Sequence, residues 1–126
     1  MTNAPIRLLI LGTGGMAANH AAAFAAIPGV TLAGGVDTRP GALAAFCDRF
    51  GIPLRFAALD QALDHGGFDA VTNVTPDAAH CATTLPALAA GLHVLCEKPL
   101  ATRAADAAEM AGAAARAGVV NMVNLS

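Results

Sequence analysis

Short apolar runs alternate with amphipathic segments along the whole chain, and glycine or proline separates most of them. Continuous apolar runs that end at glycines are typical of strands buried on both faces of a parallel sheet. The segments predicted to be strands are 6–11, 30–36, 54–57, 70–74, 93–96 and 119–123. Segments with apolar residues at helical spacing follow them, at 15–27, 41–50, 59–65, 77–90 and 102–117. The pattern predicts strands and helices in strict alternation.

This alternation indicates how the elements are arranged in space. A strand, a helix and a second strand in succession almost always form a right-handed crossover between parallel strands, and helices then cover both faces of the sheet. Six such strands predict the doubly wound (Rossmann) α/β fold with strand order 3-2-1-4-5-6. No linker, repeat or low-complexity tract interrupts the pattern, so residues 1–126 are predicted to form one domain.

Several local features are expected within this arrangement. Asp77 and Thr102 are predicted to cap the helices that follow them, and Pro86 is expected to kink or loosen its helix. His65 is expected to be structural, and so is His20, which falls on the predicted buried face of the first helix. That face consists of Met16, His20, Ala23, Phe24 and Ile27.

Composition limits the classes of function. Of the 126 residues, 56% are hydrophobic and 13% charged, which excludes intrinsic disorder. A net charge of −2 with scattered basic residues argues against a nucleic-acid partner. The cysteines form neither a C-x-x-C pair nor a metal-binding cluster, so we expect no metal and a reducing, cytoplasmic location. No stretch is long and apolar enough for a membrane helix, and the apolar run near the N-terminus is too short for a signal peptide.

The turn after the first strand carries a phosphate-binding pattern. The sequence GTGGMA, from Gly12 to Ala17, fits G-x-G-x-x-A between a strand and a helix. Gly12 allows the tight turn, Gly14 lets the backbone approach a pyrophosphate, and Ala17 lets the helix pack closely on the sheet. The helix N-terminus offers free N–H groups to the phosphates. The alternative is a tight strand-to-helix turn without a ligand.

Asp37 strengthens the dinucleotide interpretation, because it ends the second strand, where a carboxylate can bind both ribose hydroxyls. Arg39 leaves the choice of cofactor open, since an arginine there can pair with the 2′-phosphate of NADP. Asp37 would repel that phosphate. We therefore predict NAD, with NADP as the alternative, and Arg39 as a solvated loop residue remains a second interpretation.

Four stretches occur in an order and spacing that resemble a known family: GTGGMAANH, VDTRPGALAAF, FDAVTNVTPDAAH and AGLHVLCEKPLA. They are similar to the N-terminal domain of the glucose–fructose oxidoreductase / inositol dehydrogenase (Gfo/Idh/MocA) family. The resemblance covers essentially the whole chain. It implies a second α/β domain, absent from this sequence, that would complete the substrate pocket.

The resemblance also implies roles for the strand ends. Thr75 and Pro76 would lie beside the nicotinamide, with His80 one turn further on, although helix packing is an alternative role for His80. Lys98, the only lysine of the chain, would be the catalytic residue, and a surface loop lysine is the alternative. The expected cofactor-binding residues are Gly12, Thr13, Gly14, Gly15, Met16, Asp37, Thr38, Arg39, Val74, Thr75, Pro76, His80, Glu97 and Lys98.

The chemistry of Lys98 can be argued without the family. Oxidation of an alcohol by hydride transfer leaves a developing alkoxide, which an ammonium can stabilise or a neutral amine can deprotonate. Glu97 would oppose the base role if its side chain faced Lys98. The Lys98–Pro99 peptide bond is expected to be cis. Asn73 departs from the family, which usually has an apolar residue there.

The sequence therefore predicts the NAD(P)-binding domain of an oxidoreductase that acts on a sugar or polyol. By itself the chain is expected to bind cofactor without turnover and to form a homo-oligomer. A non-catalytic NAD sensor or scaffold is one alternative, and a different doubly wound nucleotide binder is another. Substrate identity is left open.

Overall fold

The structure is a computed structural model and describes residues 4–124. Its strands are β1 (Ile6–Leu11), β2 (Val30–Val36), β3 (Leu54–Phe56), β4 (Ala70–Asn73), β5 (His93–Glu97) and β6 (Asn121–Asn124). Its helices are α1 (Gly15–Ala25), α2 (Pro40–Phe50), α3 (Leu59–His65), α4 (His80–Ala89) and α5 (Ala104–Ala117), with a short 3₁₀ helix η1 (Asp77–Ala79) before α4.

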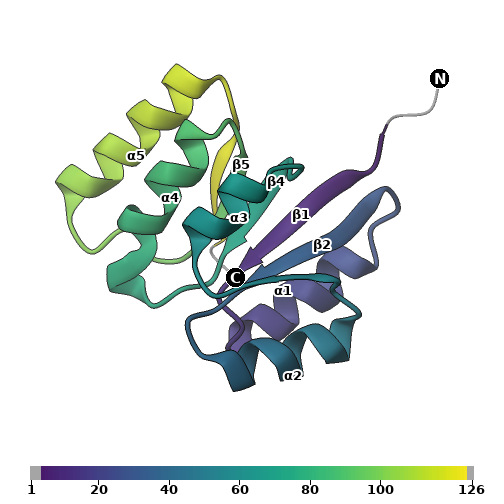
Figure 1. Cartoon of the computed structure of the whole chain (residues 1–126). Helices are drawn as coiled ribbons and strands as arrows, with labels where there is room; N and C mark the ends of the chain where they lie inside the picture. Colours follow the sequence, from purple (N-terminus) through teal and green to yellow (C-terminus); the bar gives the residue numbers. More distant parts are fainter. Residues whose placement is uncertain (1–3, 125–126) are drawn as a thin grey trace.

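The strands form one sheet in which every neighbouring pair is parallel, in the order β3-β2-β1-β4-β5-β6. Helices α1 and α2 lie on one side of this sheet, and α3, α4 and α5 lie on the other (Figure 1). The predicted doubly wound fold and strand order are confirmed. Since all strands run in the same direction, their carboxyl ends meet at one edge, where ligands bind in such folds.

The core follows the two-residue period of β1, which lies in the middle of the sheet. Leu8 and Ile10 pack with residues of α1 and α2, whereas Leu9 and Leu11 pack with residues of α3, α4 and α5. All four are at most 3% exposed. Successive side chains of a strand point to opposite faces, so a continuous apolar run is what a central strand requires.

The predicted buried face of α1 is wrong in part. Ala17, His20 and Ala21 are buried, while Met16 and Ile27 are 46% and 47% exposed. Small alanines let α1 approach the sheet closely, so the contact surface centres on them and the larger side chains lie beside it. Ile27 also lies beyond the end of the helix at Ala25.

Two predicted helix caps are also wrong. Asp77 begins η1 and makes no side-chain capping bond, because the N–H of Ala79 bonds the carbonyl of Pro76 and α4 begins only at His80. Thr102 does not cap α5, which begins at Ala104 with Arg103 at the cap position and no side-chain capping bond. Pro86 lies inside α4, which continues to Ala89.

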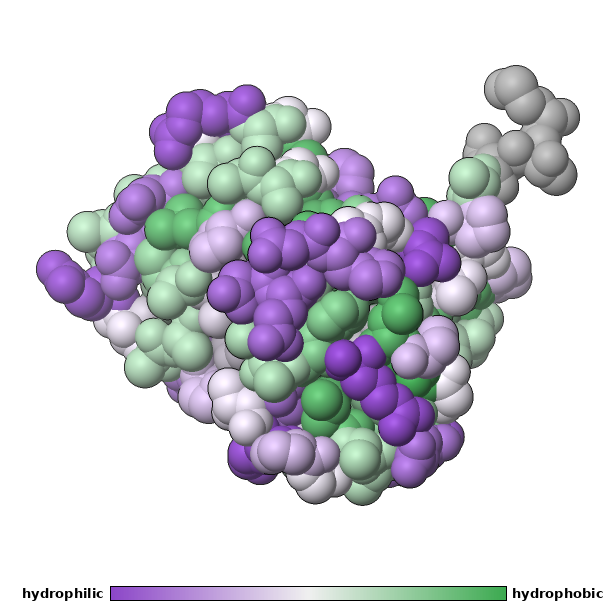
Figure 2. All heavy atoms as spheres, viewed as in Figure 1, coloured by the Kyte–Doolittle hydropathy of each residue, from purple (hydrophilic) through white to green (hydrophobic). Residues whose placement is uncertain are grey.

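The visible surface mixes residue types. Figure 2 shows a hydrophilic group over α3, with apolar residues exposed between and around the polar ones. Among the helices of residues 4–124, none has both the length and the apolar character needed to cross a membrane.

Candidate functional site

A pocket of about 790 Å³ lies at the carboxyl edge of the sheet, beside the ends of β1, β2 and β4. This volume is in the range of small-molecule and cofactor sites. Eleven residues predicted to contact the cofactor line it: Gly12, Thr13, Gly14, Gly15, Met16, Asp37, Thr38, Arg39, Val74, Thr75 and Pro76. Residues that were not predicted complete the lining: Leu11, Val36, Ala58, Leu59, Ala79 and Thr83.

The turn between β1 and α1 has the geometry expected of the glycine pattern. Gly12 has a φ of +94°, and a Cβ atom there would lie 2.7 Å from the carbonyl oxygen of Val74. Gly14 immediately precedes α1, and a Cβ atom there would meet nothing within 4 Å. The turn is therefore packed tightly at Gly12 against the main chain that follows β4, and it is open at Gly14. The N–H of Ala17 bonds the carbonyl of Gly14 at 3.1 Å, whereas those of Gly15 and Met16 have no partner within the helix and are available to an anion.

Asp37 follows β2 directly, and its carboxylate is held by the glycine turn and by Arg39. Oδ2 accepts hydrogen bonds from the N–H and the hydroxyl of Thr13, at 3.0 and 2.6 Å. Oδ1 accepts bonds from the N–H and Nε of Arg39, at 2.8 and 3.1 Å. Burial by itself raises the pKa of Asp37, but the hydrogen bonds from Arg39 and Thr13 outweigh it and hold this pKa well below its ordinary value of 3.8. Asp37 is therefore ionised at neutral pH.

Arg39 competes for the same carboxylate that a ribose would use. Its Nη2 lies 3.0 Å from Oδ2 of Asp37, and the Arg39 side chain is 64% exposed. Asp37 raises the pKa of Arg39 through this hydrogen bond. Because the guanidinium is largely in solvent, it can move aside and free one acceptor position on each carboxylate oxygen for a ribose hydroxyl.

Asn73 fixes the end of β4. It is fully buried, and its amide donates to the hydroxyls of Thr83 and Thr84 at 2.8 and 2.9 Å. Its carbonyl oxygen accepts the hydroxyl and the N–H of Thr75, at 2.7 and 3.2 Å. The unusual polar residue in this strand therefore ties the pocket-lining turn at Thr75 to α4. The sequence marked Asn73 as polar in a buried strand but did not identify its partners.

Lys98 follows β5 at the same edge. The last β4–β5 pair is Asn73 with Cys96, so Thr75 and Lys98 both come two residues past the end of the ladder. Lys98 is exposed and forms no ion pair with any residue of 4–124. The expected cis Lys98–Pro99 bond is confirmed.

Three residues that were expected to contact the cofactor are not among those that line the pocket: His80, Glu97 and Lys98. Glu97 is 9% exposed and its carboxylate lies 2.6 Å from Nε2 of His20. His80 is fully buried, with its two ring nitrogens beside main-chain carbonyls. Neither residue lines the pocket.

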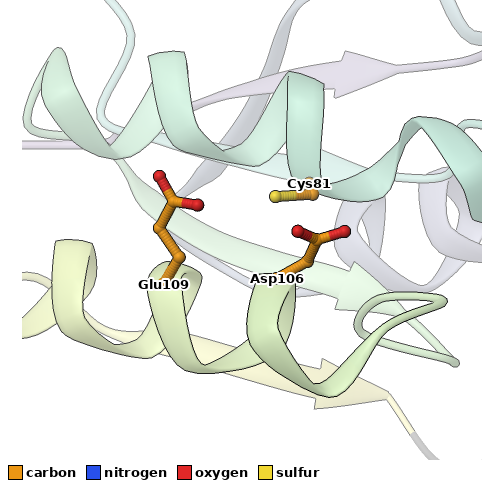
Figure 3. A group of neighbouring side chains, drawn as sticks. All are labelled: Cys81, Asp106 and Glu109. Atoms are coloured by element: carbon orange, nitrogen blue, oxygen red, sulfur yellow. The ribbon is translucent and has the colours of Figure 1, made fainter.

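A separate group of polar side chains lies between α4 and α5. Cys81, Asp106 and Glu109 point toward one another there (Figure 3), with one ligand atom of each within 4.8 Å of the others. Burial raises the pKa of the Cys81 thiol, and the charges of Asp106 and Glu109 raise it further. None of the three lines the pocket.

Residues 6–125 match the sequence profile of the Gfo/Idh/MocA oxidoreductase family, described as an NAD-binding Rossmann fold. The chain belongs to this family. Relatives include the inositol 2-dehydrogenase of Leifsonia xyli subsp. xyli, 41% identical over 85% of this chain and 32% of the relative. The D-glucoside 3-dehydrogenase of Escherichia coli strain K12 is 32% identical over 95% of this chain and 34% of the relative.

Solved structures of a dehydrogenase and an oxidoreductase have the same fold. The WlbA dehydrogenase from Bordetella pertussis, in complex with NADH and UDP-GlcNAcA, superposes with a TM-score of 0.91 at 35% identity, covering 95% of this chain and 37% of that one. An oxidoreductase from Agrobacterium radiobacter in complex with NAD⁺ also gives a TM-score of 0.91, at 29% identity over 94% of this chain and 35% of that one. The chain spans about a third of the length of the curated relatives it matches. The matched portion is the NAD-binding Rossmann domain of the family.

Proposed function

We propose that this chain binds NAD across the carboxyl edge of the sheet and serves as the cofactor-binding part of a sugar or polyol dehydrogenase. The observation that carries the proposal is the ionised Asp37 beside the glycine turn, on the wall of a cofactor-sized pocket. Its carboxylate can accept hydrogen bonds from both ribose hydroxyls, while the open turn at Gly14 and the N-terminus of α1 receive the pyrophosphate. The names of the relatives, which include inositol and glucoside dehydrogenases, support the substrate class.

Lys98 is the residue we propose for catalysis. Bound NAD would accept a hydride from the alcohol carbon. The substrate hydroxyl must lose its proton as this happens, and an amine or ammonium within reach of the oxygen assists by accepting the proton or stabilising the developing charge. Lys98 fits because it is exposed at the carboxyl edge of the sheet, two residues past the end of the β4–β5 ladder, and has no carboxylate partner within residues 4–124.

The proposal extends to the whole protein. We expect residues beyond this stretch to close the pocket over Lys98, as a second domain would, because a pocket open to water weakens electrostatic catalysis. This chain alone is then expected to bind NAD without useful turnover. We place the protein in the cytoplasm, since its three cysteines are free and suit a reducing compartment. Self-association as a homo-oligomer is also part of the proposal.

Replacement of Lys98 tests the catalytic role. In a hybrid that joins this chain to the remaining portion of the Leifsonia inositol 2-dehydrogenase, we expect Lys98→Ala to lower kcat for inositol by roughly 10²–10⁴-fold. The affinity for NADH should be unchanged, because the pyrophosphate and ribose contacts lie elsewhere. Lys98→Arg is the matched control for charge, since guanidinium does not deprotonate. An unchanged kcat in Lys98→Ala would rule out the role given to this lysine.

A further inference from the structure

Each neighbour of Lys98 in the chain is held by a different buried histidine. On one side, the Glu97 carboxylate lies 2.6 Å from Nε2 of His20. On the other, the carbonyl oxygen of Pro99 lies 2.6 Å from Nδ1 of His80. His20 and His80 are 5% and 0% exposed. The exposed lysine is therefore placed between two internal attachment points.

His20 connects α1 to two strands of the sheet, β4 and β5. A proton on Nε2 is donated to Glu97, and Nδ1 then accepts the hydroxyl of Thr72 in β4 at 2.7 Å. His20 belongs to α1, the helix that begins at the glycine turn of the pocket. Through this histidine the proposed pyrophosphate-binding helix is connected to the residue before Lys98.

His80 connects the two turns at the pocket edge. Its Nδ1 faces the carbonyl of Pro99, and its Nε2 lies 2.8 Å from the carbonyl of Thr75. Carbonyl oxygens only accept hydrogen bonds and a neutral ring has one N–H, so the two contacts are both hydrogen bonds only when both ring nitrogens carry a proton. Thr75 lines the pocket, and His80 thus fixes the residue after Lys98 relative to the pocket wall.

We propose that His20 and His80 are positioning residues for Lys98. They do not touch the reacting atoms. They hold the residues on both sides of the lysine, so that its amine projects from a fixed backbone toward the cofactor. The proposal rests on the proposed role of Lys98, and misplacement of a catalytic group by about 1 Å is enough to cost roughly 10²-fold in rate.

The chain offers a direct readout, because Lys98 is its only lysine. Labelling with ¹⁵N-lysine gives a single backbone amide signal, whose relaxation reports how rigidly Lys98 is held. Asparagine places its amide near the position of histidine Nδ1, and glutamine places its amide near Nε2. His20 uses Nε2 toward Glu97, whereas His80 uses Nδ1 toward Pro99. The two substitutions should therefore rank in opposite order at the two positions.

We expect a rigid Lys98 amide, with an order parameter of about 0.85, in the wild type, His20→Gln and His80→Asn. In His20→Asn and His80→Gln the value should fall below about 0.6. Leu88→Ala is the control for lost stability, since Leu88 is a buried core residue of α4 and contacts neither turn in the hydrogen bonds described. It should leave the Lys98 signal rigid. General destabilisation predicts no such crossed order.

Any other ranking of the four variants, or a flexible Lys98 amide in the wild type, would overturn the proposal. If a variant fails to fold, the wild type still decides: the Nε2 proton of His20 and the Nδ1 proton of His80 must both exchange slowly with water, and rapid exchange of either one contradicts it. These measurements need no cofactor. A parallel NADH titration of the wild type tests the proposed function separately, so failure of one claim can be told from failure of the other.

Discussion

Gly12 is a position in the pocket where no residue with a Cβ atom fits. Its φ is positive, and a Cβ atom there would meet the carbonyl of Val74, which is main chain and cannot rotate away. Gly15, three residues on, has open space around it. The two glycines of the same motif are therefore constrained differently: Gly12 by its backbone conformation and close packing, and Gly15 by neither.

Replacement of each glycine by alanine should reveal this difference in the stability of the chain. Gly12→Ala should destabilise the chain by at least about 1–3 kcal/mol through backbone strain and should weaken NAD binding as the turn moves. Gly15→Ala should be neutral or stabilising by up to about 1 kcal/mol, because the unfolded chain loses freedom. Thermal unfolding with and without NAD measures both effects. Equal stability of the two variants would contradict this account of the turn.

Residues recognisable by local spacing could be brought to one site from the sequence: the glycines of the turn and Asp37 all line the pocket. The hydrogen-bond partners of His20, Glu97, Asn73 and His80 could not be predicted, because they lie in other elements or turns. His20 and Glu97 are 77 residues apart in sequence. No local pattern gives that distance, although a histidine on the inner face of α1 signals a buried polar contact that must be satisfied.

Among the elements, strands were easier to predict than helix ends. The boundaries of β1 and β2 agree with the apolar runs 6–11 and 30–36. A helix start depends on which of several local hydrogen bonds is made, and here the η1 turn takes the place of the expected cap at Asp77. The packing of α4 on α5 also brings together side chains that the sequence keeps apart, as for Cys81, Asp106 and Glu109.

The packing of α4 on α5 leads to a testable prediction about the reactivity of the Cys81 thiol. The thiolate is the reactive form of cysteine, and the raised pKa of Cys81 keeps it scarce at neutral pH. Asp106→Asn removes one charge that raises this pKa. The rate at which iodoacetamide alkylates Cys81 at about neutral pH should therefore increase. Glu109→Gln should give a smaller increase, because its charge contributes less.

Mass spectrometry identifies the modified residue. Cys47 and Cys96 are internal controls, since both are fully buried and burial raises the pKa of Cys96 to about 11. An unchanged rate at Cys81 in Asp106→Asn would show that the charges between α4 and α5 do not reach the thiol.

The molecule as a whole leaves apolar surface uncovered at one edge of the sheet. β6 is an edge strand, and Val120 and Met122 are 54% and 59% exposed. They border an apolar groove of about 180 Å³ that Phe24 and Leu95 also line. Exposed apolar surface beside an unpaired strand edge favours association with another surface.

We therefore expect the chain to self-associate through this edge. Met122→Glu should shift the population toward monomer, because a charge in the contact would have to be desolvated. Ala115→Glu, on the exposed side of α5, is the matched control for added charge and should leave the association unchanged. Light scattering over a range of concentrations measures the mass. A wild-type monomer at high concentration would contradict the prediction.

The central claim is that the pocket binds NAD with Asp37 on the adenosine ribose, and a calorimetric titration of the chain with NAD and with NADP tests it most directly. The account predicts tighter binding of NAD, because the ionised carboxylate attracts ribose hydroxyls and repels a 2′-phosphate. In Asp37→Ala this preference should shrink or reverse, since Arg39 is then free to pair with the phosphate. Tighter binding of NADP by the wild type, or no binding of either cofactor, would contradict the account.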